Sequence, residues 1–425
     1  MVRLFRYPVG VVALATLVVG PPSLAQEAAT TGPGAGASAL VAACAAQAAH
    51  PQDEDSPSHG VAFAAIDAEA AIGACRKARA VYPDHAPTAY HLARAFQAGG
   101  FVQDARDAFV AAIDAGHARA GLGLALLYRD ENGLPYGPED AIAPLQTAAG
   151  AGVAVAAYEL GWAYANGLGV TENPEEALRW YARAAIRGVP EAQFEMGWAA
   201  ETGRGMDPDP ARAADWYEKA ARSGNLMAMN NLGWLHAQGD GVARDPARAV
   251  ELYRAAADGG EPVAMGNLAW MLENGIGASQ DTAAAADWYQ RAAEAGEAQS
   301  MLALGNLYLL GQGVERDPGT ALTWFARARS AGRVEALSYM GEVFEKSDDR
   351  RDPDRAAAFY YRALQAGDGW PASRRARGWD RDTARALQQR LKDAGHYKGP
   401  IDGIIGGGSR AAMRAVLDAA GAASN

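Results

Sequence analysis

The chain has 425 residues, of which 49% are hydrophobic, so it is long enough to form more than one hydrophobic core. Its formal net charge of −11 argues against a general nucleic-acid-binding protein, because such proteins neutralise phosphates with an excess of Lys and Arg. Its richness in alanine fits an all-helical chain.

The first residues have the organisation of a secretory signal peptide. Arg3 and Arg6 precede the apolar run 9–19, and small residues ending at Ala25 provide a cleavage site. The run is too short for a comfortable membrane span, and no other stretch is apolar enough to cross a bilayer. We therefore expect residues 1–25 to be removed, no stable membrane insertion, and a periplasmic location. An uncleaved anchor is the alternative.

The segment after the signal peptide begins with a leader and continues as short helices. Residues 26–38 are mostly Gly, Ala, Thr and Pro, which is typical of a flexible leader. A polar, acidic break at 51–58 interrupts the helical patterns that follow. These patterns cover residues 39–49, 62–80, 86–98 and 101–115.

Cys44 and Cys75 are the two cysteines of the sequence, and both lie in this helical segment. In an exported chain an isolated pair favours a disulfide. Closing a loop of about 30 residues would contribute roughly 3–4 kcal/mol. The alternative is two buried thiols on helices that never meet. We do not expect a catalytic thiol, because no His or Asn is arranged near either cysteine in a recognisable way.

The middle of the chain repeats one pattern every 36 residues. The pair Leu160-Gly161 returns at this step as Met196-Gly197, Leu232-Gly233, Leu268-Ala269, Leu304-Gly305 and Met340-Gly341. The pair Trp180-Tyr181 returns as Trp216-Tyr217, Leu252-Tyr253, Trp288-Tyr289 and Trp324-Phe325. A fixed period of this length indicates a solenoid of stacked units, in which each unit contacts its neighbours.

Each unit is expected to be a pair of helices. Apolar residues at helical spacing predict a first helix, and the glycines of Gly167-Leu168-Gly169 break it. Asn173-Pro174 then predicts the start of a second helix, since Asn caps free amides and Pro tolerates the first helical position. We expect Trp180 and Tyr181 to be buried, so that truncating Trp180 would cost roughly 3–5 kcal/mol.

The repeated pattern A-x-x-x-L-G-x-x-Y-x-x-G-x-G-V…D-P-x-x-A-x-x-W-Y-x-x-A-A-x-x-G resembles the Sel1-like repeat, a relative of the tetratricopeptide repeat. Residues 192–224 and 228–260 carry most of it. The resemblance covers 118–367 and implies an all-α fold, an α-solenoid that binds other proteins rather than an enzyme. The preceding helices lack the Gly-x-Gly insertion and are closer to a tetratricopeptide unit, so we expect residues 39–117 to cap the N-terminal end.

Four tryptophans form a row in successive first helices. Trp162, Trp198, Trp234 and Trp270 follow the core Leu or Met by two residues, about 200° around a helix, so their indoles are expected to point away from the packed stripe. Polar residues lie one turn to either side: Glu159, Glu195, Asn231, Asn267, Asn166, Thr202, Gln238 and Asn274. Such a row would suit a peptide or glycan strand. The alternative is that each indole packs against the next unit.

Residues 368–381 interrupt the repeat and combine arginine with tryptophan. The residues concerned are Arg374, Arg375, Arg377, Arg381, Trp370 and Trp379. These charges would suit acidic groups on a wall polymer or a lipid. A run of this kind is more often a solvated linker, which is what we expect here.

The last segment, residues 382–419, carries a second pattern: Leu387-Gln388-x-x-Leu391, Gly395-His396-Tyr397, Ile401-Asp402-Gly403 and Ser409. The leucines stripe one helix, and Ser409 is placed to cap another. The pattern resembles the peptidoglycan-binding type 1 domain, with its signature L-Q-x-x-L…G-Y-Y-x-G-x-I-D-G. The resemblance implies a small three-helix C-terminal domain. We expect it to bind peptidoglycan through Tyr397, Ile401, Asp402, Gly403 and Ser409.

No catalytic constellation is found. The sequence has no H-E-x-x-H, G-x-S-x-G, C-x-x-C or Walker loop, and its seven histidines lack ligand spacing. We therefore predict a non-catalytic, wall-associated periplasmic scaffold, without cofactor or metal, that binds peptidoglycan and an unidentified envelope protein. The alternatives are an accessory or activator of a cell-wall-remodelling enzyme, and a cytoplasmic assembly adaptor that keeps its N-terminus.

Overall fold

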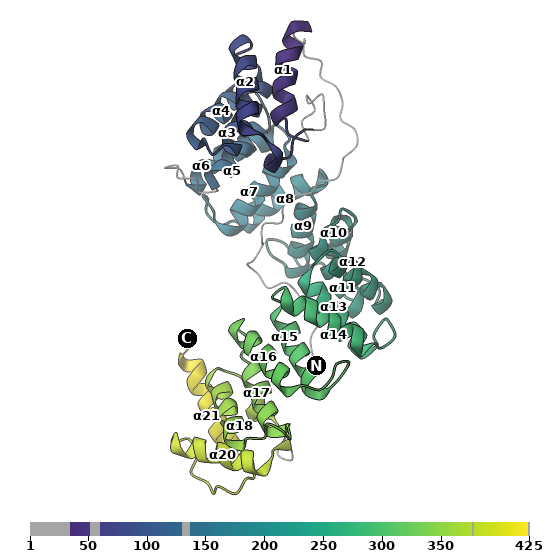
Figure 1. Cartoon of the computed structure of the whole chain (residues 1–425), viewed down its shortest axis with the longest axis vertical. Coiled ribbons are helices and arrows are strands. Elements are labelled where there is room, and N and C mark those ends of the chain that lie inside the picture. Colours follow the sequence, from purple (N-terminus) through teal and green to yellow (C-terminus); the bar gives the residue numbers. More distant parts are fainter. Residues whose placement is uncertain (1–34, 52–59, 130–136, 376–377, 424–425) are drawn as a thin grey trace. The chain divides into compact units, whose positions relative to one another are not determined.

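The computed structural model describes residues 35–51, 60–129, 137–375 and 378–423, so the expected signal peptide and most of the leader lie outside the described residues. Every regular element in these ranges is helical, which confirms the all-α fold (Figure 1). The chain forms two compact units, one within residues 10–225 and the other within residues 226–425.

The first unit begins with the expected N-terminal cap and continues into the repeats. Its helices are α1 (Ala35–Ala48), the short η1 (Phe63–Ala65), α2 (Ala68–Val81), α3 (Ala86–Ala98), α4 (Val102–Asp114), α5 (Ala120–Arg129), α6 (Pro138–Gly150), α7 (Ala154–Asn166), α8 (Pro174–Ile186), α9 (Pro190–Thr202) and α10 (Pro210–Arg222).

The second unit contains the remaining repeats and the C-terminal segment. Its helices are α11 (Leu226–Gln238), α12 (Pro246–Asp258), α13 (Pro262–Asn274), α14 (Thr282–Glu294), α15 (Ala298–Leu310), α16 (Pro318–Ser330), α17 (Ala336–Lys346), α18 (Pro353–Gln365), α19 (Trp370–Ser373), α20 (Arg381–Asp393) and α21 (Gly407–Ala423).

The repeats are helical hairpins whose boundaries follow the sequence signals. In α8 the side chain of Asn173 accepts a hydrogen bond from the Glu176 amide at 3.1 Å, and Pro174 occupies the first turn. Gly167 ends α7 in the left-handed conformation at φ +68°. The second glycine of each turn lies against the preceding hairpin: a Cβ on Gly205 would lie 2.9 Å from the Pro174 carbonyl oxygen. Stacking therefore requires glycine at this position.

Each hairpin is organised around one aromatic ring, and this ring is the Tyr of the aromatic pair. Tyr217 and Tyr253 are fully buried, and Phe325 occupies the same position in a later repeat. Where a glycine follows the core Leu or Met, it makes room for the ring, because a Cβ on Gly161 would lie 2.5 Å from Tyr181. The repeat with Ala269 at this position also buries its ring, that of Tyr289. The Tyr217 hydroxyl donates to Glu201 at 2.8 Å.

The expectation that Trp180 is buried together with Tyr181 is corrected by the structure. Trp180, Trp216 and Trp324 keep part of their surface in solvent, since neighbouring residues on a helix point about 100° apart. A cation three residues later covers each indole. The distances from charge to ring centroid are 4.4 Å for Arg183, 4.0 Å for Lys219, 4.7 Å for Arg291 over Trp288 and 4.3 Å for Arg327.

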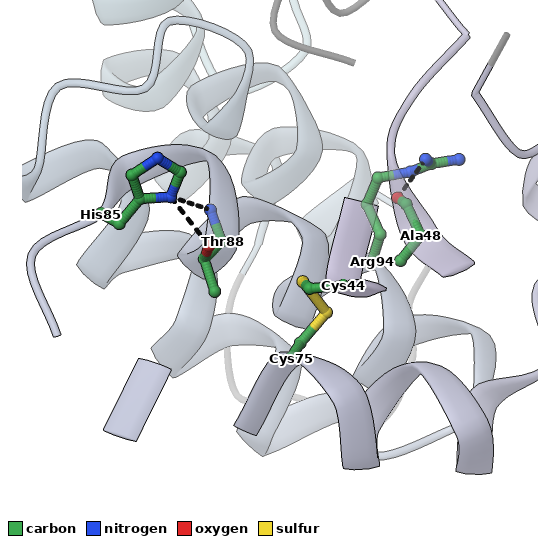
Figure 2. Close-up of a disulfide and its surroundings, with 6 residues drawn as sticks. All are labelled: Cys44, Ala48, Cys75, His85, Thr88 and Arg94. Atoms are coloured by element: carbon green, nitrogen blue, oxygen red, sulfur yellow. Dashed lines mark hydrogen bonds between the residues drawn. A yellow bond between two sulfur atoms is a disulfide. The ribbon is translucent and has the colours of Figure 1, made fainter. Parts of the chain in front are cut away.

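In the N-terminal cap, a disulfide joins α1 to α2. Cys44 and Cys75 are fully buried, with their Cα atoms 4.5 Å apart (Figure 2). Beside it, the buried Arg94 donates to the carbonyl oxygens of Ala48 at 2.6 Å and Val61 at 2.9 Å. The helix expected from residue 62 begins only at residue 68, because the Asp67 side chain caps the Ala70 amide at 3.1 Å.

The C-terminal segment packs directly on the last repeat. Helix α18 contacts both α20 and α21, and one hydrophobic core joins Tyr360 of α18 to Leu387 of α20 and Met413 of α21. Helix α19 is a single turn. The range 382–419, where a three-helix domain was expected, therefore holds only the two helices α20 and α21, and α18 of the repeats completes their core.

Candidate functional site

The C-terminal site is built around the fully buried side chain of Gln388 on α20. Its amide nitrogen donates to Asp402 Oδ1 at 2.9 Å, to the Ile404 carbonyl at 3.1 Å and to Ser409 Oγ at 3.2 Å. Its amide oxygen accepts from the Gly403 amide at 2.9 Å. One glutamine thus holds the loop 395–406 against α20 and the start of α21.

The residues predicted to bind peptidoglycan meet at this loop, but most of their polar groups are used to hold it. The Tyr397 hydroxyl donates to the Pro400 carbonyl at 3.0 Å, and Ser409 is 1% exposed. Asp402 also accepts from the Ile404 amide at 2.9 Å, and the pKa of Asp402 is lowered, chiefly by its hydrogen bond from Gln388. Ile401 packs against the core of the segment.

An open hollow of about 630 Å³ lies beside this loop. The exposed side chains at its edge include His396, Lys398 and Ile404, and Ile404 is 61% exposed. Of the predicted residues, Tyr397, Asp402 and Ser409 border the hollow, whereas Ile401 and Gly403 do not. The exposed side chains of His396, Lys398 and Ile404 are available to a ligand.

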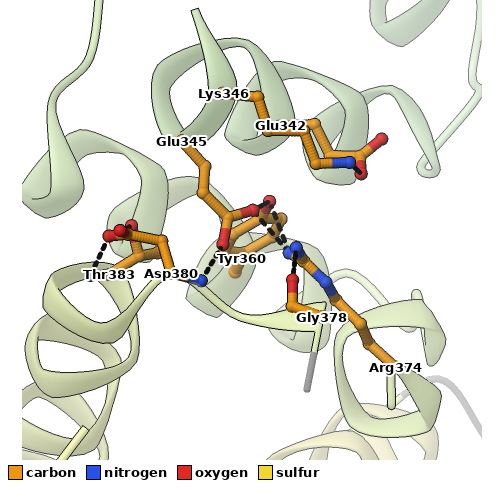
Figure 3. Close-up of polar contacts among 8 residues, drawn as sticks. All are labelled: Glu342, Glu345, Lys346, Tyr360, Arg374, Gly378, Asp380 and Thr383. Atoms are coloured by element: carbon orange, nitrogen blue, oxygen red, sulfur yellow. Dashed lines mark hydrogen bonds and ion pairs between the residues drawn. The ribbon is translucent and has the colours of Figure 1, made fainter. Parts of the chain in front are cut away.

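A buried ion pair fixes the C-terminal segment to the last repeat (Figure 3). Arg374 Nη1 lies 2.5 Å from Glu345 Oε2, and the two side chains are 8% and 1% exposed. The same carboxylate accepts from the Tyr360 hydroxyl at 2.7 Å and from the Asp380 amide at 2.9 Å. The Arg374 guanidinium also lies 4.6 Å from the centroid of the Trp379 ring. We call these five residues the Glu345 cluster.

The Glu345 cluster corrects the expectation of a solvated linker at 368–381. Asp368 is 6% exposed and accepts from the Ser338 hydroxyl. Asp380 caps α20 through the Thr383 amide at 2.9 Å and pairs with Arg351 at 2.9 Å. The side chains of Asp368, Arg374 and Asp380 thus have partners on the last repeat, whereas Arg375 and Arg381 are exposed. Arg377 lies outside the described residues.

The tryptophan row is divided between the two units, with Trp162 and Trp198 in the first and Trp234 and Trp270 in the second. All four side chains are partly buried. Trp162 and Trp270 pack against the hydrophobic cores of their units, and Arg204 lies 5.5 Å from the Trp198 ring centroid. Each tryptophan side chain of the row thus has one part buried against the protein and another part exposed to solvent.

Most polar neighbours of this row form bonds within the protein. Asn166 and Thr202 donate to the carbonyl oxygens of Trp162 and Trp198, both at 2.8 Å. Glu159 pairs with Arg129 at 2.8 Å. In the second unit, the buried Asn267 donates to Asn230 at 2.8 Å. These polar groups therefore stabilise the stacked repeats, and their hydrogen bonds are already formed within the protein rather than offered to a ligand.

Glu195 differs from these neighbours. It accepts no hydrogen bond from the part of the chain that the structure describes, and burial raises its pKa to about 7 while Arg204 acts in the opposite direction. Burial also raises the pKa of Tyr181, and the Glu195 charge adds to this effect.

The described helices include none that is long and apolar enough to cross a membrane. Within the same residues, no three His, Cys, Asp or Glu side chains are grouped so that they could hold a metal ion.

Two residues that organise the C-terminal segment, Gln388 and Glu345, were not among the site residues predicted from the sequence. Gln388 was part of the recognised pattern, and its position beside Leu387 on an otherwise amphipathic helix was the available signal. Glu345 gave no signal, because its partner Arg374 lies 29 residues away across the end of the repeat.

Comparisons with known proteins identify the same repeats that the structure shows as helical hairpins. The Sel1 repeat family model matches six times, at residues 154–189, 190–225, 226–261, 262–297, 297–332 and 334–368. No curated protein matches the chain.

Two solved structures are similar over long stretches. A protective antigen of uropathogenic Escherichia coli strains that displays an SLR fold is 25% identical, with a TM-score of 0.65 over 76% of this chain and 71% of that one. A Sel1 repeat protein from Oxalobacter formigenes is 27% identical, with a TM-score of 0.51 over 58% of this chain and 96% of that one. The matched repeats span half of the sequence, and the chain belongs to the Sel1 repeat family, whose helical hairpins serve as protein-interaction scaffolds.

Proposed function

We propose that this chain is a non-catalytic, exported scaffold that binds peptidoglycan through its C-terminal segment and a protein partner through its repeats. The observation that carries the proposal is the loop organised by Gln388, which presents an open hollow at the end of a Sel1 solenoid. The signal-peptide pattern of residues 1–25 and the Cys44–Cys75 disulfide support export to an oxidising compartment.

The chemistry at the hollow suits a polymer of sugars and short peptides. His396 and Lys398 offer hydrogen-bond donors, and Ile404 offers an apolar contact. A cationic side chain such as Lys398 also complements the carboxylates of peptide stems. The contacts of the Glu345 cluster would hold the last repeat at a fixed position relative to the proposed peptidoglycan-binding loop.

Incubating the purified mature protein with sacculi tests this proposal. We expect the protein to sediment with the sacculi and to release no muropeptides. Released muropeptides would identify a wall-remodelling activity instead. Mass analysis of the chain isolated from cells gives the second readout: a mature N-terminus at Gln26 supports export, and an intact Met1 contradicts it.

A further inference from the structure

A second hollow lies in the repeats, away from the loop organised by Gln388. It has a volume of about 830 Å³ and is bordered by helices α15 to α18. Its apolar surface comes from Met301, Leu322, Met340, Phe344 and Phe359. The Phe344 and Phe359 rings stack with centroids 5.6 Å apart.

Helix α16 carries short side chains beside the hollow at positions where α14 carries longer ones. On α16 these positions hold Thr323, Ala326 and Ser330, which all border the hollow. The residues 36 positions earlier, on α14, are Asp287, Gln290 and Glu294. At these positions the side chains of α16 are therefore smaller than those of α14 and carry no negative charge.

The charge around the hollow is positive, although the whole chain is acidic. Helix α16 contains no Asp or Glu, and its Arg327 borders the hollow. On α18, Arg362 lies 5.6 Å from the Phe359 ring centroid, and Arg355 lies 5.5 Å from that of Phe344. Neither Arg327 nor Arg362 forms an ion pair with another described residue.

Nearby carboxylates are already engaged. Asp352 caps α18 through the Arg355 amide at 2.9 Å and lies 3.3 Å from the Arg355 guanidinium, and Glu342 pairs with Lys346 at 2.5 Å. An incoming carboxylate would therefore meet cations whose charge is not neutralised within the protein.

We infer that this hollow is a docking site for a short acidic segment of a partner protein. A large apolar side chain of the segment enters the hollow, and flanking carboxylates meet Arg327 and Arg362. The hollow is open to solvent, which suits side chains on a peptide better than a long acyl chain. The inference rests on the proposed function, because it assumes that the repeats bind a protein.

The test selects peptides against the full mature chain and against a matched variant. The probe is a phage-displayed library of random dodecapeptides. The variant is Thr323→Asp/Ser330→Glu, which places the acids of α14 at the same positions of α16 and is therefore expected to fold. The control variant, Asp287→Thr/Glu294→Ser, makes the reverse exchange on α14.

We expect the wild type and the control variant to enrich peptides with Asp and Glu around a Leu, Phe or Trp, and the Thr323→Asp/Ser330→Glu variant to lose them. A selected peptide with a fluorescent label should bind the double variant at least about tenfold more weakly, by anisotropy. Arg327→Gln/Arg362→Gln should weaken binding without filling the hollow, and its salt dependence should be smaller than that of the wild type.

Three outcomes would overturn the docking site: enrichment of basic or purely apolar peptides, acidic peptides that bind all variants equally, or binding only to phosphatidylglycerol vesicles. Sacculus sedimentation of the same variants separates this result from the wall proposal. A double variant that sediments normally and keeps the peptide overturns the docking site alone. A wild type that binds the peptide and fails to sediment overturns the wall proposal alone.

Discussion

The segments that flank the repeats are stabilised by different chemistry. At the N-terminal side, the Cys44–Cys75 disulfide joins α1 to α2 in an apolar cap. At the C-terminal side, the buried pair of Glu345 and Arg374 attaches α19 and α20 to the last repeat. Terminal units of a solenoid need such caps, because each would otherwise expose the face that a neighbour covers. The stability of the N-terminal cap is therefore expected to depend on redox conditions. That of the C-terminal segment is expected to depend on the neutralisation of a buried charge.

The largest expected effect comes from breaking the C-terminal pair. Glu345→Ala leaves the Arg374 guanidinium buried without its carboxylate, which should destabilise the second unit by about 3–5 kcal/mol. Urea unfolding measures the loss, and hydrogen exchange should locate it in α17 to α20. The exposed pair of Arg222 and Glu218, with side chains 75% and 40% exposed, provides the control: Glu218→Ala should cost less than about 1 kcal/mol. Equal effects of the two substitutions would contradict the role of the cluster.

A comparable loss of stability is expected for a core substitution in an inner repeat, which contains neither the disulfide nor the Glu345 cluster. Tyr217→Ala empties the site of a fully buried ring and should cost about 3–5 kcal/mol. Trp216→Ala removes a partly exposed ring and should cost only about 1–2 kcal/mol, because less apolar area leaves water. Thermal and urea unfolding of the two variants side by side test this difference. A larger loss for Trp216→Ala would show that the Trp of each pair organises the hairpin.

Removing the N-terminal crosslink has the next largest effect. Cys44→Ser/Cys75→Ser opens a loop with a sequence separation of 31 residues, and the chain-entropy relation gives about 3–4 kcal/mol. Unfolding with and without reductant should show the loss in the first unit only. A reductant that leaves the wild type unchanged would contradict the contribution of this bond.

The smallest effect concerns Glu195 and depends on pH. Its folded-state pKa of about 7 lies above the ordinary glutamate pKa of 4.5, because the carboxyl group is buried. Between these values the folded state keeps a proton that the unfolded state releases, so the free energy of unfolding falls as pH rises towards 7. Glu195→Gln should flatten this dependence and add about 1 kcal/mol at pH 8. An identical profile for Glu195→Gln and the wild type would rule out the shifted pKa.

The repeat period predicted most of the fold because each helix start and stop has a local cause, such as the Asn173 cap or the Gly167 turn. The burial of Tyr217 rather than Trp216 could not be read from the pattern. Both residues are aromatic neighbours, and the packing of the partner helix, where a Cβ on Gly197 would lie 2.7 Å from the Tyr217 ring, decides between them. The packing of residues 368–381 could not be predicted from the sequence either, because the partner of Arg374, Glu345, lies 29 residues away in the chain.

The loop organised by Gln388 is the proposed peptidoglycan-binding element, and a pair of matched substitutions tests this proposal. Ile404 is 61% exposed at the C-terminal hollow, and Ile186 is 80% exposed in the first unit. Co-sedimentation with sacculi should fall at least about tenfold in affinity for Ile404→Asp and remain at the wild-type value for Ile186→Asp. Equal sedimentation of the wild type and both variants would contradict peptidoglycan binding at this loop.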